Sequence, residues 1–212
     1  TASGWLSTPL PSTSITAGGN TDVGLSYSVA QMIERIASRE DAANPPQLVV
    51  TTAPAPVTTT LAPTADTFVY QGLPAQTNGS TTPLLASAGS YRSLLRFDTS
   101  WIGPGATVTA ATLRLYATVG LTSGGIQVRP AGDAWSEAGT SWSNQPPWSS
   151  QVLATSATQS VPGWISISLP PSAVMRGANT SLGLSYSLAQ MIERVSSRES
   201  AATSPQLVVT TA

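Results

Sequence analysis

The chain has 212 residues, of which only 9% are charged, and its formal net charge is −1. This composition excludes a basic surface that recruits nucleic acid or anionic lipid. It contains no Cys and no His, and all nine cationic residues are Arg, which excludes disulfide bonds and catalysis by Cys or His. No apolar run approaches the roughly 20 residues that span a bilayer, so we expect neither nucleic-acid binding nor membrane insertion.

The first segment of the chain occurs twice. Residues 1–53 align without a gap to residues 160–212, and 32 of these 53 pairs are identical. Several of the differences keep an apolar position apolar, such as Val23 opposite Leu182. The constant offset of 159 predicts a tandem repeat with a 159-residue period, represented here by one unit and the final third of a preceding one.

Residues 1–53 read as several short strands. Apolar and polar residues alternate over 22–29, and this period of two predicts a half-buried strand. Residues 47–52 read as another strand. Residues 29–40 have two interpretations, because their apolar positions fit helical spacing while a weaker alternation fits a strand.

Residues 54–63 are rich in Pro, Thr and Ala. Such a composition favours an extended, stiff spacer without a packed core. We therefore predict a linker between residues 1–53 and a complete domain at 64–212.

The complete domain is rich in short alternating segments. We predict strands at residues 90–98, 108–119, 126–129 and 164–169, and one helical turn within 170–175. Turns rich in Gly, Pro and Ser separate them. This pattern predicts an all-β fold, an antiparallel β-sandwich that is jelly-roll-like in its long connections.

Several segments carry a family resemblance. They are residues 65–69, 90–98, 106–116, 135–137 with 141–146, and 197–199 with 205–207. Together they resemble the DNRLRE domain, a family that overlaps carbohydrate-binding module family 96 and the disaggregatase-related repeats. The resemblance covers nearly all of 63–212, and residues 1–53 resemble the family's final third. It implies a β-sandwich, favours a strand within 29–40, and implies an extracellular or cell-surface location. Polysaccharide binding, to alginate in some members, is among the roles it allows.

Carboxylates are the remaining candidates for catalysis, yet no spacing joins any two of Asp66, Asp98, Asp133 and Glu137 into a catalytic pair. We therefore expect that the protein is not an enzyme. The adjacent charges Glu34/Arg35, Arg39/Glu40, Glu193/Arg194 and Arg198/Glu199 are interpreted as structural ion pairs at strand ends. No metal site and no cofactor is predicted; a structural calcium ion near Asp66 stays open, although no EF-hand spacing exists.

Aromatic residues gather in one Ser/Pro-rich segment, which contains Trp135, Trp142 and Trp148. Indole faces stack on sugar rings, so Trp142 and Trp148 are candidate glycan-binding residues, together with Arg92 for an acidic sugar. The competing interpretation, which the sequence favours, is that Trp135 and Trp142 plug a loop onto the core. Arg92, Arg96 and Arg114 alternate outward and form either a cationic stripe or an ion-paired face.

Residues 1–53 lack the strands that should pair with them, because the chain holds only one front part for two final thirds. We therefore predict that they mediate contacts between copies of the chain. The candidate assembly residues are Val23, Leu25, Tyr27, Val29, Leu48 and Val50.

The main functional hypothesis is an extracellular structural protein that assembles non-covalently into a fibre, sheath or surface layer. The alternative is a carbohydrate-binding module for an extracellular polysaccharide, with acidic polysaccharides among the candidates.

Overall fold

The computed structural model describes residues 4–26, 28, 35–52, 54–121, 123–188 and 191–212. It divides into two compact units, Thr1–Thr51 and Thr52–Ala212. The longer unit is all-β and contains two antiparallel sheets, termed sheet A and sheet B. No helix in the described residues is long and apolar enough to cross a membrane.

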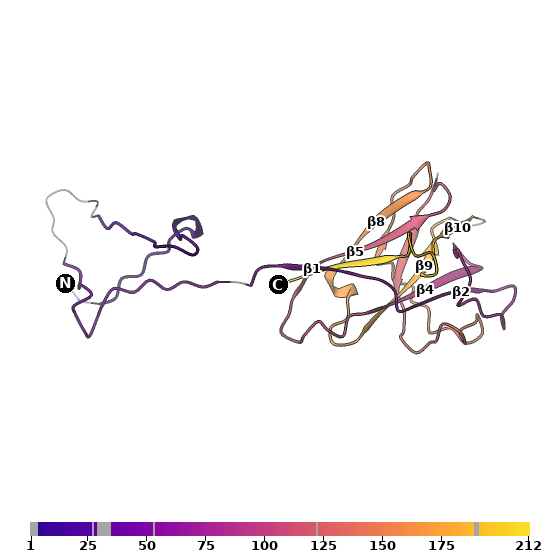
Figure 1. Ribbon diagram of the computed structural model, residues 1–212, viewed down its shortest axis with the longest axis horizontal. Coiled ribbons are helices and arrows are strands. Elements are labelled where there is room, and N and C mark those ends of the chain that lie inside the picture. Colours follow the sequence, from indigo (N-terminus) through magenta and orange to yellow (C-terminus); the bar gives the residue numbers. More distant parts are fainter. Residues whose placement is uncertain (1–3, 27, 29–34, 53, 122, 189–190) are drawn as a thin grey trace. The chain divides into compact units, whose positions relative to one another are not determined.

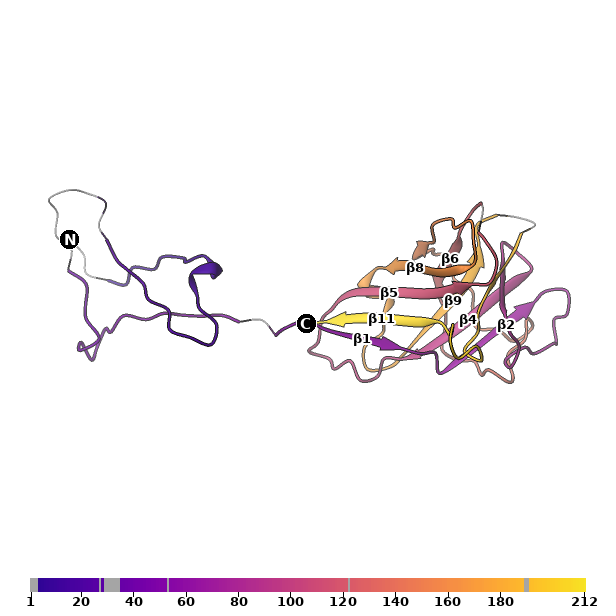
Figure 2. The ribbon, with the colours of Figure 1, turned by 45° about the horizontal axis from the view of Figure 1, so that its top comes forward.

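Sheet A has the strand order β1-β11-β5-β10-β3, and β8 also pairs with β5. Its strands are β1 (Val57–Leu61), β3 (Leu84–Ser87), β5 (Val108–Ala117), β8 (Gly163–Leu169), β10 (Ile192–Val195) and β11 (Gln206–Thr211). Figure 2 shows β11 lying between β1 and β5, with β8 on the far side of β5.

Sheet B has the strand order β2-β4-β9-β6-β7. Its strands are β2 (Ala65–Tyr70), β4 (Tyr91–Asp98), β6 (Ile126–Pro130), β7 (Ala154–Thr155) and β9 (Asn179–Tyr186). The strands β2, β4 and β9 can be followed in Figure 1.

The core lies between the two sheets, because each strand turns alternate side chains inward. In β5, Leu113 and Leu115 are fully buried, while Arg114 between them stays half-exposed. From sheet B, Leu95 of β4 and Leu184 of β9 join the same apolar cluster. Burying such side chains contributes about 1.5–3 kcal/mol each. The predicted antiparallel β-sandwich is confirmed.

Most sequence-predicted elements of this unit are present. Residues 90–98, 108–119, 126–129 and 164–169 form β4, β5, β6 and β8, and the predicted turn contains the 3-10 helix η2 (Pro171–Ala173). The linker prediction is wrong for Val57–Leu61, which forms edge strand β1 against β11. Three consecutive Thr in this stretch are β-branched, and the open edge of β11 supplies their hydrogen-bonding partners.

The shorter unit contains the 3-10 turn η1 (Ser12–Ser14), and its described residues contain no strand. The strands predicted at 22–29 and 47–52 are therefore wrong for the described residues there. The duplicate segments at 181–188 and 206–211 supply most of β9 and all of β11, with a neighbouring strand on each side. A strand needs such neighbours, because its backbone N–H and C=O groups pair only across a ladder.

Four candidate assembly residues of the shorter unit are exposed: Val23 by 47%, Leu25 by 72%, Leu48 by 50% and Val50 by 49%. Tyr27 and Val29, as well as residues 29–34 of the ambiguous segment, lie outside the described residues. The duplicate of that segment contains β10, a strand.

Candidate functional site

The connection between β6 and β7 covers part of the outer face of sheet B. Trp135 of this connection is buried against Ala65 of β2 and Leu94 of β4, a small apolar cluster separate from the main core. Trp148 packs against the same cluster, and an isolated bridge joins its backbone to Ala131. The outward side chains of β4 therefore have a layer of loop residues above them.

Arg96 fastens the start of this connection. Its Nε donates to Asp133 Oδ1 at 2.6 Å, and its Nη2 donates to the carbonyls of Asp133 and Trp135 at 2.7 Å each. Its guanidinium carbon lies 4.4 Å from the centroid of a Trp135 ring. With its side chain only 17% exposed and its Nε and Nη2 engaged, Arg96 serves the fold.

Asp133 completes this anchor. Its carboxylate also accepts hydrogen bonds from Asn179 Nδ2 at 3.0 Å and from Ser181 Oγ at 2.7 Å, both on β9. Burial alone would raise the pKa of Asp133, but hydrogen bonds from Asn179, Ser181 and Arg96 outweigh it and lower this pKa below its ordinary value. The ionised carboxylate thus ties the connection to β4 and β9 together.

Arg92, two residues earlier on the same face of β4, has different surroundings. Its guanidinium carbon lies 4.5 Å from the ring centroid of Trp142 and 4.7 Å from that of Trp148. Both indoles are partly exposed. Such distances are typical of cation–π contacts, so Arg92 lies between two aromatic rings at the protein surface.

The charge of Arg92 is not balanced locally. Among the described residues no carboxylate oxygen lies within 4.0 Å of its guanidinium nitrogens, and its one side-chain hydrogen bond runs from Nη1 to Gln145 Oε1 at 3.2 Å. Burial, with a smaller effect of the Arg129 charge, lowers the pKa of Arg92 from its ordinary value. The group stays cationic at neutral pH and keeps donors available for an anion.

Arg129 of β6 adds a second cation to this face. Its nitrogens donate to Ser185 Oγ, to Gln127 Oε1 and to the carbonyls of Ser149 and Ser150. No carboxylate oxygen lies within 4.0 Å of it in the described part of the chain. The outer face of sheet B therefore has two arginines without an acidic partner.

A glycine sets the position of Trp148. A Cβ added to Gly183, in the middle of β9, would lie 2.7 Å from Cζ3 and 2.9 Å from Cη2 of Trp148. The indole thus lies directly on the backbone of β9. The absence of a side chain at Gly183 is what permits this contact.

The structure brings the candidate glycan-binding residues Arg92, Trp142 and Trp148 together. Trp135 is 9% exposed and plugs the connection onto sheet B, as the sequence favoured. Trp142 is partly exposed, so it is less of a plug than expected.

Arg114 lies on sheet A, where its guanidinium carbon is 4.7 Å from a Trp164 ring centroid, so it cannot extend a stripe from Arg92 and Arg96.

Arg129 and Gln145 were missed by the sequence interpretation. The alternation in 126–129 gave the outward direction of Arg129. The alternation could not predict which of the two sheets this strand joins, because sheet membership depends on the pairing of β6 with β9.

Three carboxylates gather at a second location. One oxygen from each of Asp66, Glu137 and Glu199 can be chosen so that all three lie within 4.8 Å of one another. Burial, together with the charges of Glu199 and Glu137, raises the pKa of Asp66 to about 7, although the backbone N–H of Arg198 opposes this shift. Arg198 Nε pairs with Glu137 at 2.7 Å and with Glu199 at 3.3 Å, so the expected Arg198/Glu199 ion pair is present. Its duplicate Arg39/Glu40 pairs at 2.8 Å.

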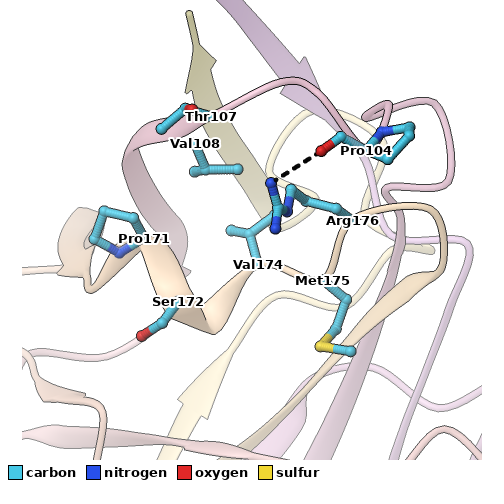
Figure 3. Close-up of a pocket in the computed structure, with 8 residues that line it drawn as sticks. All are labelled: Pro104, Thr107, Val108, Pro171, Ser172, Val174, Met175 and Arg176. Atoms are coloured by element: carbon cyan, nitrogen blue, oxygen red, sulfur yellow. Dashed lines mark hydrogen bonds between the residues drawn. The ribbon is translucent and has the colours of Figure 1, made fainter.

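A pocket of about 610 Å³ lies near the C-terminal end of the domain. Proline, Val174 and Met175 side chains form much of its lining, and Figure 3 shows Arg176 reaching across to the backbone of Pro104. Arg176 Nη1 also donates to the carbonyl of Ala106 at 2.9 Å. The described residues that line it include no aromatic ring and no carboxylate, so the pocket offers little for sugar recognition.

A family model matches the longer unit of the chain. The model of carbohydrate-binding module family 96 matches residues 57–211, from the first residue of β1 to the last of β11. No curated protein matches the sequence.

Proposed function

The chain belongs to carbohydrate-binding module family 96, and on this basis we propose that residues 57–211 bind an extracellular polysaccharide at the outer face of sheet B. The family is a class of binding modules, which is compatible with the expectation that the protein is not an enzyme. The match supports the alternative functional hypothesis better than assembly into a fibre, for which the comparisons provide no support.

The observation that carries this proposal is the placement of Arg92 between Trp142 and Trp148. Partly exposed indoles bind the apolar C–H face of a sugar ring, and a guanidinium supplies directed hydrogen bonds to its polar groups. No other described arginine lies between two indoles in this way.

We further propose that the polysaccharide is acidic. Arg92 and Arg129 leave two positive charges without acidic partners, in a protein whose net charge is −1. A uronate carboxylate matches the planar fork of an arginine, and such charge-assisted hydrogen bonds are about twice as strong as neutral ones. A neutral glucan would leave these charges unused.

Affinity electrophoresis tests both levels of the proposal. The chain should be retarded in gels containing alginate or polygalacturonate, and far less in gels containing hydroxyethylcellulose or laminarin. Arg92→Gln should lower the affinity for the uronate polymer about 10- to 100-fold, as expected for a charged hydrogen bond worth about 1.5–3 kcal/mol.

The matched control is Arg194→Gln, the same chemical change at an exposed position on β10 of sheet A. It should leave retention unchanged. Equal loss in both variants would indicate a non-specific charge effect, and equal retention by neutral and acidic gels would contradict the acidic class while keeping the binding function. Absence of retention in every gel would contradict the function itself.

A further inference from the structure

We propose that Asp66, Glu137 and Glu199 form a binding site for a divalent, oxygen-preferring cation, Ca²⁺ above all. This site is independent of the glycan-binding proposal. Its residues come from three separate parts of the domain: β2, the connection between β6 and β7, and the connection between β10 and β11.

Distances among the carboxylates suit one shared ion. Oxygens bound to the same Ca²⁺ at 2.3–2.6 Å lie at most about 5 Å apart. One oxygen from each of the three side chains meets this limit, since all three lie within 4.8 Å of one another. The packing is tight, because a Cβ at Gly79 would lie 2.7 Å from Cγ of Glu137.

The local charge balance also favours a divalent cation. The three carboxylates, when ionised, carry three negative charges, and Arg198 is the one cation that pairs with members of this cluster in the described residues. Two negative charges therefore remain around Asp66, whose relative exposure is 0%. A buried charge without compensation is costly, and a divalent ion supplies the missing charge.

Buried oxygen atoms without partners point in the same direction. Asp66 Oδ2 accepts the backbone N–H of Arg198 at 2.7 Å, but its Oδ1 is buried and has no hydrogen-bond partner among the described residues. The neighbouring Ser197 is also fully buried, and its hydroxyl oxygen lacks a partner there too. Buried polar atoms of this kind are rare in native proteins, and an ion is one of the groups that satisfies them.

The donor set selects the kind of metal. The chain has neither His nor Cys, so it cannot provide the nitrogen and sulfur ligands that Zn²⁺ and Cu²⁺ prefer. Carboxylates and hydroxyls are hard oxygen donors, which suit Ca²⁺ and Mg²⁺. Ca²⁺ tolerates irregular geometry and fits a site assembled from one strand and two connections better than the strictly octahedral Mg²⁺.

Calorimetry and thermal unfolding of the full chain test this site. After treatment with EDTA and dialysis, CaCl₂ should bind with a stoichiometry of one and with a Kd of about 10⁻⁴–10⁻³ M, the range of extracellular modules. At 10 mM CaCl₂ the melting temperature should rise by about 3–11 °C, according to where the Kd lies in this range. MgCl₂ at the same concentration should raise it less.

Two variants and a control give the result its specificity. Asp66→Asn and Glu199→Gln should each lower the Ca²⁺ affinity at least tenfold. Because Glu199 is exposed, the Glu199→Gln variant should fold even if the Asp66→Asn variant does not. Asp98→Asn makes the same change at an exposed carboxylate outside the cluster and should bind Ca²⁺ as the unaltered chain does. The proposal fails if CaCl₂ gives neither heat nor stabilisation, or if Glu199→Gln responds like the unaltered chain.

Discussion

Two arginines on the same face of β4 have opposite roles. Arg96 is paired with Asp133 and packs over the buried Trp135, so its hydrogen bonds hold the connection onto sheet B. Arg92 lies between partly exposed indoles without an acidic partner. The residue types are alike, but burial and charge pairing commit Arg96 to the stability of the fold. Under the proposed function, Arg92 and its two indoles are left for a ligand.

This difference predicts separate effects for two alanine substitutions. Trp135→Ala removes a buried indole from the small cluster on sheet B and should lower the free energy of unfolding by about 3–5 kcal/mol. Trp142→Ala should cost about 1 kcal/mol, because the side chain is already partly exposed and loses mainly its cation–π contact. Urea unfolding measures both values. A loss of 3 kcal/mol or more for Trp142→Ala would show that Trp142, like Trp135, holds the connection between β6 and β7 on the sheet.

Asp133 gives the anchor a pH dependence. Its folded-state pKa is depressed, so it contributes stability above the unfolded pKa of about 3.9 and loses this contribution as pH falls through the folded value. Asp133→Asn should therefore be less stable than the unaltered chain at pH 7, and the difference should shrink below about pH 4. Urea unfolding at pH 7, 5 and 3 measures this difference. A constant difference across the series would show that the charge of Asp133 is irrelevant.

At the scale of elements, the duplicated segment provides an internal comparison. Residues 206–211 form β11 between β1 and β5, whereas their duplicate at 47–52 forms no strand. The two sequences are identical, so the outcome depends on neighbours alone. Local alternation predicts the ability to form a strand, and the available partners decide whether the strand forms.

The same limit explains how far the sequence predicted the site. Period-two alternation predicted that Arg92 and Arg96 lie on one face of a strand and that Leu95 and Phe97 lie on its other face. This arrangement is observed in β4. Alternation could not predict that Arg114 belongs to the other sheet, because sheet membership is set by long-range pairing. Nor could spacing join Asp66 to Glu137 and Glu199, which meet only after three distant segments have folded.

The contact between Trp148 and the backbone of β9 predicts that adding a methyl group at Gly183 will disturb the proposed glycan site. Gly183→Ala forces the Trp148 ring to move, since the new Cβ would lie 2.7 Å from it. Glycan retention should fall by about tenfold or more, while the melting temperature changes by only a few degrees. The duplicate Gly24 has no atom within 4 Å of such a Cβ, so Gly24→Ala is a matched control that should alter neither property. Unchanged retention in Gly183→Ala would remove Trp148 from the site.

At the scale of the whole molecule, β1–β11 all lie between residues 57 and 211, the span of the family match. The longer unit therefore holds every strand that the structure describes. Chains beginning at residue 54 should fold and bind uronate polymers as the complete chain does. Calorimetry should give melting temperatures within about 2 °C of each other. A larger decrease would show that residues 1–53 support the domain.

The hypothesis of assembly through residues 1–53 stays a prediction. Val23, Leu25, Leu48 and Val50 are exposed, and exposed apolar side chains favour association. Light scattering should then show oligomers of the complete chain and monomers of the chain that begins at residue 54, with urea dissolving the oligomers. If both chains are monomeric at the same concentrations, the exposed side chains do not drive assembly.

Antiparallel pairing of β1 with β11 places Val57 beside Thr211, so the domain begins and ends at the same point. Tension along the polypeptide therefore acts on two adjacent residues at one end of a ladder. Such a load opens the hydrogen bonds between β1 and β11 one after another, as a zipper opens, instead of shearing them together. We expect the domain to resist pulling from its termini weakly.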